Sequence, residues 1–280
     1  MSPGFAVVAG LRYEDISLDR NSTTVTGAIA TGFPFSQSWH PTTGRLGFTW
    51  ETAPGLMLYA QYATGADVAA NNIFLLAPTQ PLELTTSRTY EAGVKHLLWE
   101  GRAEWTLAAY DIERRNVFAA QGGQQLNLAG KQVSHGVELA AAVRPTPRWN
   151  LWGTAAWTHA RYEDYVFAGG SFSGNTPPNV PTIVANAGAS YRFPTALPFE
   201  VGASVRHVGD RYNTDANTVK LLAYTVADAY AALDVGRTRI TFRVRNLTDE
   251  KYAVWGDPFY PDQILLGMPR TYEVTAAIRF

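Results

Sequence analysis

The side chains with the greatest capacity for chemistry in this sequence do not form a catalytic arrangement. Cysteine is absent, which excludes disulfides and thiolate metal sites. The carboxylates Glu91, Glu138 and Glu273 fall on polar faces opposite basic residues, where we expect salt bridges and hydrogen bonds. The histidines are scattered, with no spacing typical of metal ligands or a catalytic triad: His40, His96, His135, His159 and His207. We therefore expect no enzyme, no metal site and no cofactor.

Aromatic and arginine side chains gather instead in three segments that lack regular patterning, at residues 163–181, 209–219 and 249–269. Aromatic rings give a ligand rigid contact area, and arginine neutralises an anionic one. Recognition of a ligand is therefore the chemistry that these segments suggest. The candidate ligand-binding residues are Tyr165, Phe167, Arg211, Tyr212, Trp255, Phe259 and Tyr260.

The elements that must position these segments are β-strands, because apolar residues recur at every second position. In TRITFRVRN, Ile240, Phe242 and Val244 share one face, while arginines share the other. Twelve such segments are predicted, at residues 4–13, 43–51, 55–64, 87–99, 103–114, 131–144, 149–162, 182–193, 198–208, 220–235, 238–248 and 270–280.

The connections between the predicted strands alternate between short and long. The short ones are ETAPG, WEGR, RPTPR, FPTALP and VGR. The long ones lie near residues 14–42, 65–86, 115–130, 163–181, 209–219 and 249–269. Short turns on one rim and long loops on the other are typical of a transmembrane β-barrel, with short periplasmic turns and long extracellular loops. A soluble β-sandwich or propeller is the alternative, but it gives no reason for this alternation.

The composition fits an antiparallel, all-β barrel in the bacterial outer membrane. No run approaches the ~18–20 apolar residues of a transmembrane helix, and MSPGFAVVAG lacks the features of a signal peptide. A net charge of -1 gives no electrostatic case for binding nucleic acid. Arg239, Arg243 and Arg245 are too costly against lipid and are assigned to the lumen. Aromatic residues near segment ends suit the interfacial girdles: Trp50, Tyr59, Trp99, Trp149, Trp152 and Tyr191.

At the end of the chain, RVRNLTDEKYAVW and GMPRTYEVTAAIRF closely resemble the C-terminal end of TonB-dependent outer-membrane receptors of the ferric-siderophore group. The pattern N-L-x-D-x-x-Y, then G-x-P-R-T and a terminal aromatic, falls here on Asn246, Leu247, Asp249, Tyr252, Gly267, Pro269, Arg270, Thr271 and Phe280. Earlier pieces match in the same order, including RTYEAGVKH, AGKQVSHGVELAAA and VGDRYNTDAN. The resemblance covers the chain from about residue 4 to residue 280.

This resemblance implies a receptor that binds a ferric siderophore outside the cell and passes it inward with energy from TonB. It also implies a barrel of roughly 22 strands, preceded by a plug, a TonB-contacting box and a signal peptide. Residues 1–280 then form the C-terminal portion of the barrel domain, without those three parts. Two alternatives remain open: a self-contained outer-membrane pore or structural barrel, and a receptor for haem, cobalamin or a sugar.

The resemblance further implies partners besides the siderophore. TonB would act through the missing N-terminal part, and outer-membrane lipid would surround the barrel. The barrel-assembly machinery would read the end of the last strand, so Tyr272, Ile278 and Phe280 are predicted to form the assembly signal. Phe280 would lie at the periplasmic interface, with its ring among headgroups and its carboxylate in water.

Overall fold

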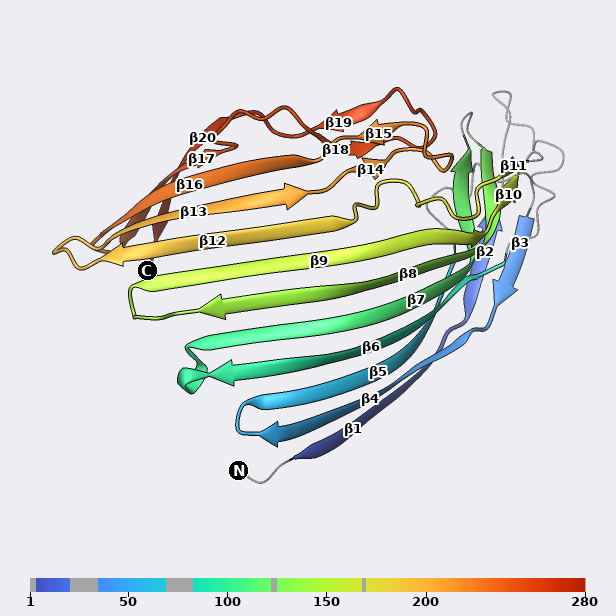
Figure 1. Ribbon diagram of the computed structural model, residues 1–280, viewed down its shortest axis with the longest axis horizontal. Helices are drawn as coiled ribbons and strands as arrows, with labels where there is room; N and C mark the ends of the chain where they lie inside the picture. The colour runs from blue at the N-terminus through green and yellow to red at the C-terminus, as the bar shows by residue number, and fades with distance from the viewer. Residues whose placement is uncertain (1–3, 21–34, 69–82, 122–124, 168–169, 280) are drawn as a thin grey trace.

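A computed structural model of the protein describes residues 4–20, 35–68, 83–121, 125–167 and 170–279. Its main element is one twelve-stranded antiparallel sheet in which sequential neighbours pair (Figure 1). The strands are β1 (Phe5–Tyr13), β4 (Thr42–Ala53), β5 (Leu56–Asp67), β6 (Thr85–Leu98), β7 (Ala103–Gln121), β8 (Gln125–Val143), β9 (Trp149–Asp164), β12 (Ile183–Phe193), β13 (Phe199–Val208), β16 (Tyr224–Val235), β17 (Thr238–Arg245) and β20 (Thr271–Ile278). All twelve predicted segments are confirmed, with ends that differ mostly by a few residues.

The short turns lie at one end of the sheet and the long connections at the other, as predicted (Figure 1). Among the residues that the structure describes, the long connections form four small two-stranded sheets: β2 (Ile16–Arg20) with β3 (Phe35–Trp39), β10 (Val166–Phe167) with β11 (Gly170–Ser171), β14 (Arg211–Tyr212) with β15 (Lys220–Leu221), and β18 (Ala253–Gly256) with β19 (Ile264–Leu266). A 3-10 turn, η2 (Trp99–Gly101), joins β6 to β7. None of the described residues forms a helix that is long and apolar enough to cross a membrane.

One predicted loop is wrong. Residues 115–121 and 125–130 belong to the sheet, because β7 and β8 continue their pairing from Ala103–Val143 as far as Gln121–Gln125. The alternation that defines a strand is interrupted at Asn116, which has a positive φ of 54°. The sequence pattern therefore suggested that the strand ends here. In the structure, Asn116 is skipped in the pairing and the strand continues from Val117. At 19 residues each, β7 and β8 are therefore longer than their neighbours β6 and β9, which have 14 and 16.

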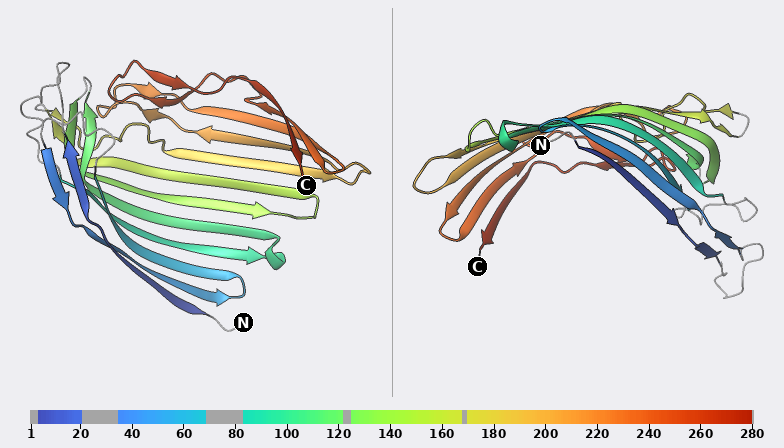
Figure 2. Two further views of the ribbon diagram at one scale, coloured as in Figure 1. Left: turned by 180° about the vertical axis from the view of Figure 1, so that it is seen from behind. Right: turned by 90° about the horizontal axis from the view of Figure 1, so that it is seen from below.

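The register separates the sheet into an apolar and a polar face. Phe242 lies opposite Val274 and Ala231, while the next residue, Arg243, lies opposite Glu273 and Tyr230. The same division runs across the sheet, so that Leu107 and Leu139 form one pair on the apolar face. A bilayer favours apolar side chains, and the sheet bends into an arch (Figure 2). The apolar face is therefore the lipid-facing side, and the polar face is the lumenal side.

The lumenal assignment of the three arginines is confirmed by their partners. Arg239 contacts Glu200 at 3.1 Å, and the Arg245 Nε donates to Glu273 at 2.6 Å. The Arg243 guanidinium lies 5.8 Å from the centre of the Tyr230 ring. β17 therefore carries its three arginines on the lumenal side of the sheet, where they are not exposed to hydrocarbon.

The predicted aromatic girdle is confirmed in part. Trp50, Trp149 and Tyr191 lie on the apolar face near the short turns, and the Trp149 and Tyr191 rings are 4.8 Å apart. Tyr59 and Trp152, however, lie on the polar face. Each ring covers a glycine on the next strand, Gly93 and Gly188 respectively, where an added Cβ would approach ring atoms to about 2.5 Å. Because these glycines lack side chains, there is space on the lumenal side for both rings.

The twelve strands do not close on themselves. β1 and β20 are the two edges of the sheet, and within the described residues they are not paired with each other. A self-contained twelve-stranded barrel would require that pairing, because an unpaired edge in a bilayer leaves backbone groups unsatisfied. The open sheet is therefore part of a larger barrel wall.

Candidate ligand-binding site

Three of the long connections meet in one cluster, which we call the loop cluster: residues 165–167 with 170–182, residues 209–223, and residues 246–270. Its centre is aromatic. Tyr162, at the end of β9, lies 5.0 Å from the ring of Tyr165, which in turn lies 5.2 Å from Phe172. Tyr165 is completely buried. The connection after β9 therefore folds back on its own strand and forms a small core with Val117 of β7.

A buried carboxylate joins this core to the second connection. The Tyr162 Oη donates a hydrogen bond of 2.7 Å to Asp215 Oδ1, and the Asn175 Nδ2 donates one of 2.8 Å to the Asp215 carbonyl oxygen. Asp215 is only 2% exposed. Burial raises the pKa of the Asp215 carboxyl to about 6, while its hydrogen bonds from Tyr162 and Tyr165 act in the opposite direction. The carboxylate is thus held in place at neutral pH, although its charge is poorly solvated.

Asparagine side chains bind the three connections together. Asn179 exchanges two hydrogen bonds with the backbone of Gly256, of 2.8 and 2.9 Å. Asn217 does the same with Thr176, at 2.8 and 2.9 Å, and the Asn213 Nδ2 donates to the Pro261 carbonyl at 2.8 Å. Asn179 and Asn217 also have positive φ values, of 61° and 56°, which asparagine tolerates better than most residues. The amides therefore replace the backbone pairing that a regular sheet would supply.

The third connection is fixed at its base by the residues that carried the sequence resemblance. Asn246 is buried, and its Nδ2 donates to the carbonyls of Glu250 and Met268 at 2.8 and 3.0 Å. The Asp249 Oδ1 accepts from the Arg270 backbone nitrogen at 2.9 Å. These contacts hold the two ends of residues 246–270 together. The motif thus has a structural role at the rim of the barrel.

Tyr252 and Gly267, two further motif positions, form a close contact. A Cβ on residue 267 would come within 2.0 Å of the Tyr252 ring, so this position accepts only glycine in this arrangement. The Tyr252 ring also lies 4.3 Å from the Tyr224 ring at the start of β16. The connection formed by residues 246–270 therefore packs against the start of β16 through these two rings.

The sequence-predicted ligand residues divide into two groups. Tyr165 and Arg211 are buried inside the loop cluster, where the Arg211 Nη2 donates to the Ala253 carbonyl at 2.6 Å and its guanidinium lies 5.7 Å from the Tyr224 ring centre. Both side chains position the connections and are not presented at the surface. Sequence reasoning missed this because their partners come from other connections.

The remaining predicted residues lie nearer the surface. Trp255 on β18 and Tyr260 are both 43% exposed, while Tyr212 on β14 and Phe259 are half-buried. Phe167 belongs to β10, and its side chain lies outside the described residues. The residues that sequence reasoning missed are the asparagines and Asp215. The alternating polar residues of RYNTDAN were the signal for Asn213, Asp215 and Asn217, whereas Asn179 lies outside that stretch.

The lumenal face also carries polar groups along β4, β5 and β6, on the side of the sheet away from the loop cluster. A groove of about 280 Å³ is lined by Arg45, Tyr59, Glu91 and Lys95, among others. The Lys95 Nζ lies 5.2 Å from the centre of the Tyr59 ring, and the Gln61 Nε2 donates to Glu91 at 3.2 Å. The expected polar environment of Glu91 is confirmed, and Glu273 has its basic partner in Arg245.

The structure pairs two of the histidines that the sequence analysis treated as isolated. His135 and His159 lie directly opposite each other on β8 and β9, with ring centres 5.0 Å apart. Within the described residues, no cluster of three potential metal-ligating side chains is formed. The pair belongs to the lipid-facing side, since His159 alternates with Trp157 along β9.

This architecture matches a known family. Residues 2–247 match the family model described as TonB dependent receptor-like, beta-barrel. The chain therefore belongs to the TonB-dependent receptor family, and its sheet is part of an outer-membrane barrel wall. The members of this family that it matches are receptors and transporters.

Individual relatives and structures agree with this assignment. The chain is 26% identical over 218 residues to the ferrioxamine receptor of Yersinia enterocolitica, covering 75% of this chain and 30% of that protein. It is 29% identical over 202 residues to the ferrichrome outer membrane transporter/phage receptor of Escherichia coli K12, covering 69% and 26%. The chain thus spans less than a third of these two relatives.

The fold has close counterparts among solved structures. The siderophore receptor PiuA from Acinetobacter baumannii matches with a TM-score of 0.80 and 21% identity, over 97% of this chain and 40% of that one. The ferric yersiniabactin uptake receptor FyuA from Yersinia pestis matches with a TM-score of 0.79 and 20% identity, over 99% and 43%. At this identity the likeness establishes the fold, an open section of a larger barrel.

Proposed function

We propose that this chain is part of the barrel of an outer-membrane receptor that takes up ferric siderophores with energy from TonB. The observation that carries the proposal is the loop cluster, in which three connections are locked together at the outer rim and present Tyr212, Trp255 and Tyr260. Relatives named as ferrioxamine and ferrichrome receptors support the ligand class. A siderophore brings its own donor atoms to iron, so the protein needs to supply only contact area and hydrogen bonds.

The contacts within the loop cluster distinguish the residues that hold the connections together from those that can contact a ligand. Asn179, Asp215 and Arg211 use their polar groups to fix the connections against one another. Rigid connections reduce the conformational entropy that is lost on binding. The more exposed rings then serve as the contact surface, because aromatic side chains bury much area with little loss of rotamer freedom. Besides the siderophore, the proposed partners are TonB, outer-membrane lipid and the barrel-assembly machinery.

Uptake of radioactive iron tests this function in cells that produce the whole protein containing this chain. Ferric ferrioxamine and ferric ferrichrome are the two probes. We expect saturable, TonB-dependent uptake of at least one of them. Trp255→Ala with Tyr260→Ala should weaken binding by about tenfold or more, the usual loss when aromatic anchors are removed.

The matched control is Trp157→Ala, which removes an equally exposed ring from the lipid-facing side. It should leave the apparent affinity unchanged. If neither chelate is taken up, or if uptake persists without TonB, the proposed function is wrong. If the control variant weakens uptake as much as the loop variant does, the rings of the loop cluster are not the binding surface.

A further inference from the structure

Two histidines face each other across neighbouring strands on the lipid-facing side of the sheet. His135 of β8 and His159 of β9 are directly opposite in the register, and their ring centres are 5.0 Å apart with planes inclined by 43°. Within the described part of the chain, neither imidazole forms a hydrogen bond. Each neutral ring therefore has a nitrogen lone pair that these residues do not use.

The separation of the two rings suits a shared metal ion. A tetrahedral zinc ion binds imidazole nitrogens at about 2.0–2.1 Å, which places the centres of two coordinated rings about 5 Å apart. The 5.0 Å between His135 and His159 matches this value, so rotation of the side chains is enough to bring one nitrogen of each ring to the same ion. The paired backbone on both sides of the two histidines provides a rigid base for such a site.

A carboxylate continues the arrangement on the third strand. Asp111 of β7 lies directly opposite His135, so the three residues form one line across β7, β8 and β9 on the same face. Asp111 is exposed, and its carboxylate has no ion pair or hydrogen bond among the described residues. Histidine ligands of metals donate their second nitrogen to a carboxylate in many proteins, which fixes the ring and raises its basicity. Asp111 is placed to do this for His135, and its charge would offset that of the ion.

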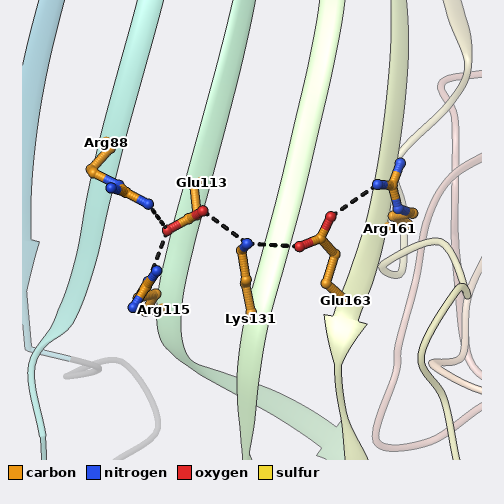
Figure 3. Close-up of polar contacts among 6 residues, drawn as sticks. All are labelled: Arg88, Glu113, Arg115, Lys131, Arg161 and Glu163. Carbon is orange, nitrogen blue, oxygen red and sulfur yellow. Dashed lines mark hydrogen bonds and ion pairs between the residues drawn. The ribbon is translucent and has the colours of Figure 1, made fainter.

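The line lies at the outer limit of the apolar band. Tyr62 and Tyr90 continue it on β5 and β6, with ring centres 4.9 Å apart, as expected of an interfacial aromatic girdle. Beyond this level, six charged side chains form ion pairs across β6 to β9 (Figure 3). Because such charges are costly in hydrocarbon, the boundary with water lies here, and dissolved ions can reach the histidines. Arg161, two residues from His159, is paired with Glu163 at 2.9 Å, so its positive charge is compensated.

We propose that His135 and His159 bind a divalent transition-metal ion such as Zn²⁺ on the outer surface of the barrel wall. Asp111 would support His135, and water would complete the coordination. Imidazole suits zinc, copper and nickel, whereas calcium and magnesium prefer oxygen ligands. The ion would link β8 to β9 where these strands leave the apolar band. The two histidines lie far apart in the sequence, so the pairing of β8 with β9 creates the site, on the face opposite the lumen.

Zinc titration of the whole protein that contains this chain, purified in detergent micelles, tests the proposal. Isothermal titration calorimetry should show one equivalent of Zn²⁺ that is no longer bound by His135→Phe or by His159→Phe. Phenylalanine keeps a ring in place, including the contact of residue 135 with Trp157, but supplies no nitrogen. Asp111→Asn should weaken the same binding by about tenfold, the loss expected when a histidine ligand loses its carboxylate partner.

Copper(II) in place of zinc identifies the ligands directly. The EPR spectrum of the copper that Zn²⁺ displaces should show coupling to two imidazole nitrogens. The matched control is His96→Phe, because His96 lies on the same face of β6, where its ring packs against Trp105 at 5.8 Å. This variant should bind Zn²⁺ with unchanged stoichiometry and affinity, and its copper spectrum should also be unchanged.

Three results would overturn the proposal. The first is a Zn²⁺ stoichiometry and affinity that both His135→Phe and His159→Phe retain. The second is an equal loss of zinc binding in His96→Phe, which would show that the ion binds surface histidines without selection. The third is a copper spectrum with only one coupled imidazole nitrogen. Heat-modifiable migration of each variant on gels verifies that its barrel is assembled.

Discussion

Tyr162 and Asp215 are 53 residues apart in sequence, yet the tyrosine hydroxyl donates a 2.7 Å hydrogen bond to the buried carboxylate. This contact joins the end of β9 to the connection between β13 and β16. It makes two of the outer connections a single unit, to which Asn179 adds the third through Gly256. The outer rim of this barrel section is therefore a folded structure with its own small core.

The first prediction concerns pH. The folded pKa of Asp215 is raised to about 6 from an ordinary value of 3.8, so the folded loop cluster binds this proton more tightly than the unfolded one. The resulting stability is fully present below pH 3.8 and is lost as the pH rises to about 6, a change of about 3 kcal/mol at most. Amide hydrogen exchange of residues 170–180 should therefore be slower at pH 4.5 than at pH 7, after correction for the intrinsic exchange rate.

Asp215→Asn is the matched variant for this effect, because its amide oxygen still accepts from Tyr162 but no longer titrates. Its corrected exchange rates should be the same at the two pH values. A variant that retains the full pH dependence would assign the effect to another group.

The second prediction concerns Asn179. Replacing it with alanine removes two hydrogen bonds to Gly256 and should destabilise the closed loop cluster by about 2 kcal/mol. Asn179→Gly separates the two causes, because glycine relieves the positive φ but lacks the amide. Limited proteolysis within residues 246–270 measures the effect, with Asn150→Ala on the barrel wall as the control. Equal resistance of all three variants would contradict a role for the amide.

The third prediction concerns Gly267. A methyl group at this position would collide with the Tyr252 ring, so Gly267→Ala should displace the connection at a cost of about 1–3 kcal/mol. Tyr252→Ala should cost stability by itself, but it should remove most of the additional effect of Gly267→Ala. A double-mutant cycle on the rate of proteolysis within residues 246–270 measures this coupling. Additive effects of the two substitutions would show that the contact is not the reason for the glycine.

The fourth prediction concerns the last strand. Tyr272 and Ile278 both face lipid on β20, and Tyr272 lies 6.3 Å from the Phe242 ring. Phe280 lies outside the described residues, and its role in assembly stays a prediction. Deleting Phe280, or changing it to Asp, should lower the assembled fraction in a membrane-fractionation assay without changing ligand affinity. An unchanged assembled fraction would reject an assembly signal at this end.

Much of the barrel wall could be predicted from the sequence. A strand between lipid and lumen must alternate apolar and polar residues, so Ile240, Phe242 and Val244 were recognisable without a structure. The alternation of short and long connections located the two rims for the same reason. The same alternation puts Tyr59 and Trp152 on the lumenal face, because each lies next to a lipid-facing leucine, Leu58 and Leu151. The girdle prediction was wrong for these two residues because it used only their ring type and their place near a strand end.

The loop cluster and the ion pairs of Glu113 with Arg88 and Lys131 (Figure 3) depended on the tertiary structure. Tyr165 and Arg211 had the residue types of ligand contacts, but their burial is set by partners in other connections. Glu113 meets both Arg88 and Lys131 only because the register of β6, β7 and β8 brings them to one level. The sequence by itself determined which residues face lipid, since that follows from a period of two along each strand. Only the folded sheet decided which of those residues meet across strands, because register and loop packing depend on contacts between distant parts of the chain.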